Sequence, residues 1–389
     1  MFPPIFVWLF IATWITTIFA SPIDRSLAPK NLLLPRAPTR PTLTGAPVPI
    51  GAGTYPRATR LRDGTIVAVY TAFQSGSNIL LTARSTNNGA TFTPLGEITR
   101  GASNANDIDN AYLLQLPTPS TRILCAFRNH SKDPVTGTYT FFRITITASD
   151  DGGKTWRYLS QPASDPGPVT GNWEPYLRTT SDGTNALQLY YSRENNAQDQ
   201  DTLQRTSHDG GLSWSPATCI SGCGLTARDG MTSIATINTN TNSKSLILVY
   251  ETSSAATAGL FSVGAVFSAD DGRTWSGRCT IYTASSPHTS AGAPQVINVG
   301  GTLVVSFMTN EDQRLQAPAG AYTETTAVKV VTSGDGGKTW GNKVTVGERQ
   351  SSWPGLLDLG PAGGGGGARF LYLLERGGLG VRSQLMTLM

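Results

Sequence analysis

One eight-residue motif recurs along the chain and divides it into repeats. The motif reads Ser-x-Asp-x-Gly-x-Thr/Ser-Trp, and complete copies begin at Ser149, Ser207, Ser268 and Ser333. A weaker copy begins at Ser85, where Asn87 replaces the Asp and Phe92 replaces the Trp. Successive copies are 58 to 65 residues apart. Self-similarity at a nearly constant period is typical of a repeat architecture.

The residue types in this motif predict a folded turn, which we call the box turn. An Asp or Asn accepts hydrogen bonds from backbone amides two or three residues further on. Gly supplies the positive φ of a tight hairpin. The Trp is a large apolar side chain that can fix the turn against the rest of the repeat. We therefore interpret the motif as structural rather than catalytic.

Six units follow one plan when the chain is divided at these turns. Each unit reads as two strands, a variable loop, a third strand that runs into the box turn, and a fourth strand beyond it. The sixth unit has neither motif nor fourth strand, so residues 42–50 are expected to supply that strand and close a ring. This plan predicts an all-β fold, a six-bladed β-propeller of four-stranded antiparallel blades. The alternative is a solenoid, which needs capping repeats that the sequence does not show.

Composition agrees with such a fold and excludes some partners. Only 14% of the residues are charged and 42 of 389 are Gly, which suits short strands and many turns. The net charge is +4 without a run of Lys or Arg, so no nucleic-acid partner is expected. The three His form no ligand cluster, and His130 and His208 are expected at the surface. No metal and no other cofactor is therefore expected.

The N-terminal segment predicts secretion. Residues 1–20 are apolar and end in a small residue before Ser21, so we expect a signal peptide cleaved after Ala20. A signal anchor is the alternative. Residues 21–45 are rich in Pro, Thr and Arg and predict a leader or extended arm, which leaves 46–389 as the propeller. We expect a secreted, extracellular monomer without membrane contact after cleavage.

The four cysteines suit an oxidising compartment. Cys219 and Cys223 flank a short loop and are expected to pair, in preference to a disulfide that uses Cys279. Cys125 lies in an apolar run and is expected to be a buried free thiol.

The repeated box turns resemble those of the sialidase superfamily over roughly residues 50–389. The resemblance implies that the first strand of each blade lines a central channel. Because strand direction alternates, the starts of first strands and the ends of second strands should share one mouth, opposite the box turns. Carboxylates, Arg and aromatic residues concentrate in these segments, and this combination suits sugar chemistry.

Two glutamates at this mouth are the catalytic candidates. Glu174 lies between Trp173 and Pro175, and Glu251 follows an apolar run beside Tyr250. A structural alternative is that either carboxylate only pairs with an arginine at the rim. Glu194 and Glu311 are interpreted as surface charges. Further substrate contacts are expected from Arg57, Asp109, Asn110, Trp173, Tyr176, Arg228, Asp229, Tyr250 and Trp353.

Departures from the sialidase pattern favour another family with this fold. A sialidase needs three arginines for the substrate carboxylate and a Tyr nucleophile. An Arg is expected where Ala291-Gly-Ala-Pro stands, and the Tyr where Trp353-Pro-Gly stands. The segments Asn172–Leu177, Arg228–Met231, Val249–Glu251 and Trp353-Pro354 are instead similar to family 93 of the glycoside hydrolases, secreted fungal exo-arabinanases.

That resemblance implies release of arabinobiose from the non-reducing end of linear α-1,5-L-arabinan with retention of configuration. Glu174 and Glu251 fall on the family's two catalytic glutamates, and our hypothesis makes Glu174 the nucleophile and Glu251 the acid/base. The alternatives are a sialidase-like exo-glycosidase acting on another glycan and a non-catalytic, secreted glycan-binding propeller. In each case the partner is a polysaccharide or oligosaccharide.

Overall fold

The computed structural model describes residues 39–389 except 170, 238–243, 314–324 and 362–366. The expected signal peptide and residues 21–38 of the expected arm lie outside these residues. The described elements are β-strands and one 3-10 turn, η1 (Ala255–Thr257). No helix in the described part of the chain is long and apolar enough to span a bilayer.

Four sheets contain four strands each, and all their neighbouring strands are antiparallel. The first comprises β2 (Thr54–Arg60), β3 (Ile66–Gln74), β4 (Ser77–Ser85) and β5 (Thr93–Ala102). The second comprises β6 (Asn106–Gln115), β7 (Ile123–Lys132), β8 (Tyr139–Ser149) and β9 (Arg157–Pro166). The third comprises β18 (Ala291–Val299), β19 (Thr302–Thr309), β20 (Ala327–Ser333) and β21 (Gly341–Gly347).

The fourth of these sheets closes the ring as predicted. It comprises β22 (Ser351–Pro361), β23 (Ala368–Arg376), β24 (Gly380–Leu388) and the N-terminal strand β1 (Pro41–Gly51). β1 pairs antiparallel with β24, from Pro41 opposite Leu388 to Gly51 opposite Val381. The chain therefore joins its two ends in one sheet, and β1 begins within the segment that we expected to be an extended arm.

The remaining strands correct the prediction of six separate blades. β10 (Asn172–Thr179), β11 (Leu187–Asn196), β12 (Asp199–Ser207) and the short β13 (Thr218–Ser221) belong to one eight-stranded sheet with β14 (Ala227–Thr236), β15 (Leu246–Ser254), β16 (Ser262–Ser268) and β17 (Ser276–Tyr282). β12 pairs in parallel with β14 at Gln200 and Arg228. The third and fourth repeats share one sheet because β13 covers only part of the edge of β12. The rest of that edge is free to pair with β14.

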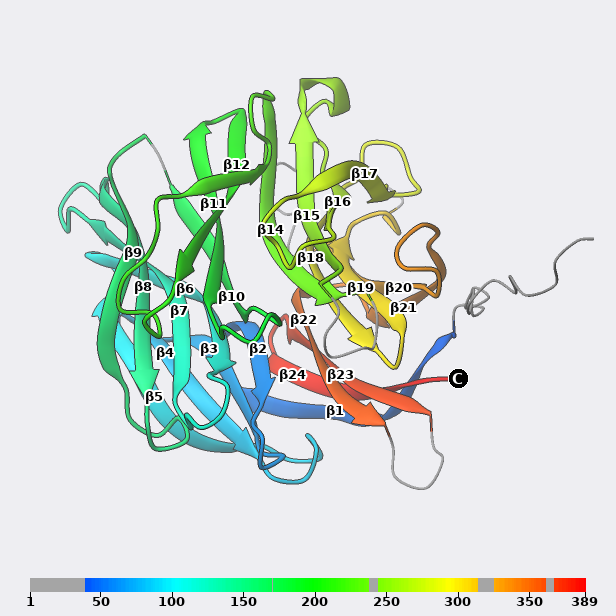
Figure 1. The fold of residues 1–389 in the computed structure, drawn as a ribbon, viewed down its shortest axis with the longest axis horizontal. Helices are drawn as coiled ribbons and strands as arrows, with labels where there is room; N and C mark the ends of the chain where they lie inside the picture. Colours follow the sequence, from blue (N-terminus) through cyan, green and yellow to red (C-terminus); the bar gives the residue numbers. More distant parts are fainter. Residues whose placement is uncertain (1–38, 170, 238–243, 314–324, 362–366) are drawn as a thin grey trace, which may run out of the picture. The chain divides into compact units, whose positions relative to one another are not determined.

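The sheets are arranged around a common centre. The strands β2, β6, β10, β14, β18 and β22 each contact the next, and β22 contacts β2. They lie nearest the middle in Figure 1, with β5, β9, β17, β21 and β1 at the outside. Apolar side chains fill the spaces between neighbouring sheets. Every residue of β19 is buried, because both faces of its sheet are covered. The fold is an all-β propeller.

The box turns have the predicted hydrogen bonds. In the turn between β8 and β9, Asp151 Oδ1 accepts the backbone N–H groups of Lys154 and Thr155 at 3.1 and 3.0 Å. The Trp156 indole donates to the Gly153 carbonyl at 3.0 Å. Hydrogen bonds from the Thr155 hydroxyl and backbone hold the pKa of Asp151 well below its ordinary value. This carboxylate therefore serves the turn.

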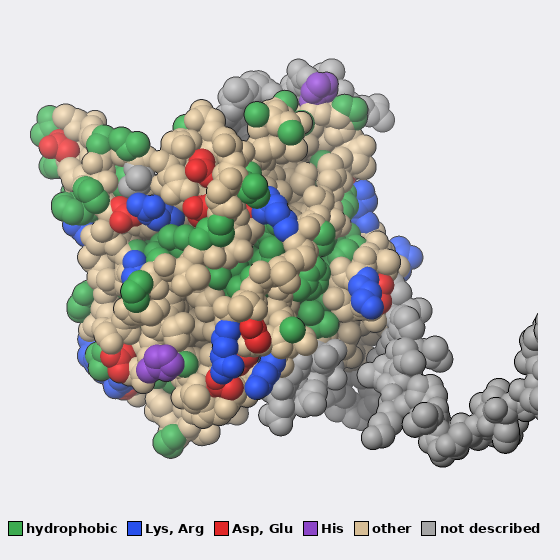
Figure 2. Space-filling model, turned by 45° about the horizontal axis from the view of Figure 1, so that its top comes forward, with side chains coloured by type: hydrophobic (Ala, Val, Ile, Leu, Met, Phe, Trp, Pro, Cys, Tyr) green, Lys and Arg blue, Asp and Glu red, His purple; other side chains and the backbone are tan. Residues whose placement is uncertain are grey.

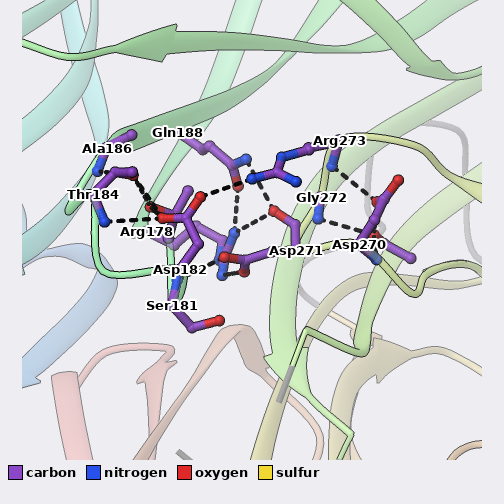
Figure 3. Close-up of polar contacts among 12 residues, drawn as sticks. Arg178, Ser181, Asp182, Thr184, Ala186, Gln188, Asp270, Asp271, Gly272 and Arg273 are labelled. Carbon is purple, nitrogen blue, oxygen red and sulfur yellow. Dashed lines mark hydrogen bonds and ion pairs between the residues drawn. The ribbon is translucent and has the colours of Figure 1, made fainter. Parts of the chain in front are cut away.

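One box turn also contacts the first strand of the preceding repeat. Asp271 occupies the second x position of its box, where φ is +65°, and it is 1% exposed. Figure 3 shows its carboxylate pointing at the Arg178 guanidinium, with which it forms an ion pair. Its other oxygen accepts the Ser181 backbone N–H at 2.6 Å. We call this contact the Arg178–Asp271 clasp.

The cysteines lie as predicted. Cys219 and Cys223 form a disulfide, Cys125 is a buried free thiol, and Cys279 is free and exposed.

Charges on the face drawn in Figure 2 occur in small groups in which Lys or Arg lies near Asp or Glu. Two of the exposed ion pairs show the same mixing, Arg273 with Asp182 at 2.9 Å and Arg122 with Asp150 at 2.7 Å.

Candidate functional site

The central strands share one irregularity that shapes the site. Each has a register shift near its start, and a residue with φ between +42° and +54° lies in each shift. These bulge residues are Tyr55, Asn110, Glu174, Met231, Ala293 and Trp353. A β-bulge leaves an extra residue out of the ladder and re-aims its side chain. Each central strand therefore directs the side chain of its bulge residue in the same way.

Proline explains part of this irregularity. It follows the bulge residue in four of the strands, at Pro56, Pro175, Pro294 and Pro354. Proline has no backbone N–H, so it is tolerated where the ladder is interrupted. The Trp-Glu-Pro and Trp-Pro segments of the sequence are thus bulge signals, although sequence analysis interpreted them only as site motifs.

Glu174 is the one acidic residue among the bulge residues. The residue is partly exposed, but its Oε2 is buried and has no hydrogen-bond partner among the residues that the structure describes. The Ser192 side chain favours the ionised form of this carboxyl group. Burial raises the pKa of Glu174 to about 8, and the nearby charge of Glu251 adds to this rise. Glu174 therefore keeps its proton at neutral pH.

Glu251 lies close enough to Glu174 for their charges to interact. It pairs with Gly230 beside the bulge of β14, and its Oε2 accepts the backbone N–H of the bulge residue Ala293 at 2.7 Å. Burial raises the pKa of Glu251, whereas the Ala293 hydrogen bond and the Arg228 charge oppose that rise. The structure thus brings the two predicted glutamates together, and Glu251 ionises first.

Arg228 lies on the Glu251 side of this pair. Its Nη2 donates to Glu194 Oε1 at 2.5 Å and to Gln200 Oε1 at 2.6 Å. Glu194 was expected to be a surface charge, but it pairs with Arg228 and its charge also reaches Glu174. The prediction for Glu194 was wrong because the interaction joins residues 34 positions apart in the chain.

A second arginine lies on the Glu174 side. Arg128 contacts Asp107 at 2.9 Å and Asp109 at 3.3 Å, and its guanidinium carbon lies 5.0 Å from the centre of a Trp173 ring. Its charge opposes the rise in the pKa of Glu174. Asp109 is therefore at the site, held also by the Thr71 hydroxyl at 2.5 Å. Sequence analysis did not select Arg128, although it occurs at the end of a second strand.

Three other bulge residues, Tyr55, Asn110 and Trp353, provide aromatic surface and a polar atom. The rings of Tyr55 and Trp353 are 5.9 Å apart, and the charge of Glu174 reaches the Tyr55 hydroxyl. Asn110 is 4% exposed. Its Oδ1 and the buried Trp173 indole N–H have no hydrogen-bond partner among the described residues. A ligand with several hydroxyl groups could satisfy such atoms where it reaches them.

Three of the residues expected to contact the substrate instead make contacts within the protein. Arg57 is 4% exposed, stacks on Tyr55 at 4.0 Å and donates to the Pro56 carbonyl at 2.8 Å. Tyr176 donates to the Ile234 carbonyl at 2.7 Å. Tyr250 is completely buried. Alternation along β15 turns its side chain away from the face that Glu251 occupies.

Asp229 is also bound within the protein. It is completely buried, and its carboxylate forms an ion pair with Arg278. The Thr252 and Ser221 hydroxyls donate to it at 2.7 and 2.5 Å. These contacts give Asp229 a structural role, which the sequence could not show because its partners lie outside the Arg228–Met231 motif.

Two predicted surface residues are buried. Glu311 is 3% exposed and binds Lys329 at 2.7 Å and Lys343 at 2.9 Å. These charges and the Tyr282 hydrogen bond lower the pKa of Glu311 to about 2. His130 is completely buried beside Trp173, with 4.7 Å between the ring centres. Polarity suggested exposure for both residues, and packing between sheets decided otherwise.

Among the described residues, no group of three or more His, Cys, Asp or Glu side chains could hold a metal ion. The chemistry that these residues can support is acid–base and nucleophilic, because two neighbouring carboxyl groups ionise at different pH values.

Comparisons with known proteins give a structural likeness alone. No protein-family model and no curated protein sequence matches the chain. The structure is similar to that of the α-L-arabinofuranosidase Arb93A of Fusarium graminearum, solved with an iminosugar inhibitor. The TM-score is 0.65 over 88% of this chain and 98% of that chain, at 20% identity.

Two further structures extend this likeness. The Penicillium chrysogenum α-L-arabinanase, solved with arabinobiose, has a TM-score of 0.63 over 86% of this chain and 93% of that chain, at 20% identity. The intramolecular trans-sialidase of Ruminococcus gnavus has a TM-score of 0.53 over 87% and 95%, at 13% identity. At such identities the likeness establishes the fold, because one fold can host different activities.

Proposed function

We propose that this protein is a secreted, retaining glycoside hydrolase that releases arabinobiose from the non-reducing end of linear α-1,5-L-arabinan. The observation that carries the proposal is the neighbouring pair Glu174 and Glu251, two partly exposed residues whose carboxyl groups are both raised in pKa by burial. The family-93 resemblance and the arabinobiose bound by the Penicillium enzyme support the choice of substrate.

The electrostatics of the pair favour roles opposite to our sequence-based hypothesis. A pKa of about 8 keeps the Glu174 carboxyl group protonated at neutral pH. Its Oε2 has no hydrogen-bond partner among the described residues. Glu174 therefore suits protonation of the leaving oxygen. Glu251 ionises first and is fixed by the Ala293 N–H, so it suits attack on the anomeric carbon. Glu174, then ionised, would activate water to release the product with retained configuration.

The test of function uses debranched arabinan and an aryl arabinobioside. We expect arabinobiose as the sole early product, with its configuration retained in a proton NMR time course. Early release of longer oligosaccharides would contradict exo action. Activity on a sialoside without activity on arabinan would favour the sialidase alternative, and inactivity on both would favour a glycan-binding protein.

The test of roles uses Glu174→Ala and Glu251→Ala with added azide. Azide should rescue Glu174→Ala on the activated aryl substrate and give a retained glycosyl azide, because the acid/base is missing. It should give an inverted azide with Glu251→Ala. The reverse pattern would restore Glu174 as the nucleophile. Glu97→Gln, which removes a carboxylate from an exposed ion pair with Arg100, serves as the matched control.

Secretion rests on residues 1–20. Expression of the full chain in a eukaryotic host, followed by N-terminal sequencing of protein from the medium, should give Ser21 as the first residue. A chain retained in the membrane fraction would favour the signal anchor instead.

A further inference from the structure

The strand that carries Glu174, β10, accepts a hydrogen bond from a buried imidazole of the neighbouring sheet. His130 Nε2 lies 2.7 Å from the Asn172 carbonyl oxygen, two residues before Glu174. A carbonyl can only accept, so Nε2 carries the proton and donates. His130 belongs to β7 and Asn172 to β10, so this hydrogen bond joins two sheets directly beside the Glu174 bulge.

The same neighbouring sheet makes a second bond to this residue. Asn172 is completely buried, and its side-chain amide donates to the Phe142 carbonyl at 3.0 Å. The backbone of Asn172 is thus fixed by β7 and its side chain by β8. A residue with φ of +42° costs conformational energy and persists only where its surroundings hold it.

Aromatic packing fixes the imidazole in turn. Its ring meets the rings of Trp173, Phe142 and Tyr139 edge-on, with centres 4.7, 4.9 and 5.7 Å apart. Trp173 is the residue between Asn172 and Glu174, so the ring supports both residues that precede the bulge.

The His130 imidazole remains neutral while it donates this hydrogen bond to Asn172. Burial and the charges of Arg128 and Arg143 lower its pKa to about 4, although the Asn172 carbonyl and the charge of Asp107 oppose that change. A neutral ring adds no positive charge beside Glu174, and such a charge would favour ionisation of the acid. Its Nδ1 is buried and has no hydrogen-bond partner in the described part of the chain, so Nε2 makes the hydrogen bond of this ring.

We propose that His130 is a positioning residue, which holds the Asn172–Glu174 segment in the bulge and thereby keeps the Glu174 carboxyl in its desolvated position. The inference rests on the proposed function for its catalytic consequence. It concerns a residue that is completely buried, although the sequence predicted it at the surface.

Three variants at this position separate the hydrogen bond from the packing. His130→Phe keeps a ring but loses the donor. His130→Gln places an amide N–H where Nε2 lies, whereas His130→Asn is too short to reach. We expect about 10- to 100-fold lower kcat on arabinan for the Phe and Asn variants, with KM changed less than about 3-fold, because a small displacement of a catalytic group lowers the rate strongly. His130→Gln should stay within about 3-fold of wild type.

A second readout does not depend on activity. The titration of Glu174 can be followed by NMR of ¹³C-labelled glutamate carboxyl groups and assigned by its loss in Glu174→Gln. In His130→Phe we expect its pKa to fall from about 8 by about one unit, because a relaxed bulge exposes the carboxyl to water. His130→Gln should preserve the wild-type titration.

Tyr139→Phe is the matched control, because it removes a 2.6 Å hydrogen bond to Asp107 from the same cluster without touching Asn172. It should change kcat less than about 3-fold and leave the Glu174 titration in place. If His130→Phe matches wild type in both kcat and Glu174 titration, the positioning role is wrong. If wild type does not cleave arabinan, the proposed function fails, and the titration still decides the role of His130.

Discussion

The two glutamates at the centre of this fold differ mainly in the hydrogen bonds and charges around their carboxyl groups. Glu174 and Glu251 are both glutamates near a bulge, yet one carboxyl lacks a donor at Oε2 and the other accepts the Ala293 N–H. The repulsion between them completes the difference, because the second carboxyl to ionise must do so beside an existing charge. Two identical side chains can therefore perform acid and nucleophile roles.

The pKa of Glu174 should be lower in the Glu251→Gln variant than in wild type. The variant removes the repelling charge while burial remains, so the pKa should fall below about 8 yet stay above its ordinary value. Carboxyl ¹³C NMR of the variant measures it directly. An unchanged pKa would mean that the two carboxyl groups are too far apart to act together.

The same burial predicts a cost to stability. The pKa of Glu174 in the folded protein lies above its ordinary value of 4.5. The stability that the protonated carboxyl group contributes is therefore complete below pH 4.5 and is lost as the pH rises through about 8. Glu174→Gln should therefore gain stability relative to wild type between pH 5 and pH 8.5, by roughly 1–3 kcal/mol. Urea unfolding at both pH values measures the gain. A constant difference would contradict the raised pKa.

At the scale of elements, turns and bulges connect the strands in different ways. The box turns satisfy their own hydrogen bonds, whereas each bulge frees backbone groups that neighbouring strands can use. Met231 N–H donates to Ser192 Oγ at 3.0 Å and Ala293 N–H to Glu251 Oε2 at 2.7 Å. The bulge of one strand thus orients a side chain on the preceding repeat. The Arg178–Asp271 clasp does the same on the box-turn side.

Breaking this clasp should destabilise the protein. Asp271→Asn keeps a residue that tolerates the positive φ, but it leaves the Arg178 guanidinium, 12% exposed, without its charge partner. We expect a loss of about 3 kcal/mol in the free energy of unfolding, measured by urea denaturation. Adding Arg178→Met should recover part of that loss.

The matched control for the clasp is the exposed pair Arg273 and Asp182. Arg273→Met should cost less than about 1 kcal/mol. Equal losses for Asp271→Asn and Arg273→Met would show that burial does not set the strength of these pairs.

For the whole molecule, ring closure depends on a single strand. β1 covers the edge of β24 along its length, and an uncovered edge offers unpaired N–H and C=O groups to other chains. A chain beginning at Gly53, which lacks β1, should have a Tm at least about 5 °C below that of a chain beginning at Thr39. It should also self-associate. Calorimetry and sedimentation velocity compare the two, and equal Tm values would contradict closure by β1.

Sequence patterns alone predicted the repeat length, the strand and turn pattern, closure by the N-terminal strand, the Cys219–Cys223 disulfide and the two neighbouring glutamates. These features depend on local residue types: a box turn needs Asp, Gly and Trp at fixed spacing, and adjacent repeats place equivalent positions side by side. Local patterns therefore located Glu174 and Glu251 near each other.

The contacts of the remaining polar residues became clear only from the folded arrangement of the strands. Asp229, Glu311 and His130 look equally polar in sequence, yet all three are buried by partners on other strands. The merging of two expected blades through β12 and β14 likewise depends on an edge left uncovered by β13. The physical reason is the same in each case, because burial and charge pairing are set by what lies across a sheet interface and not by neighbours in the chain.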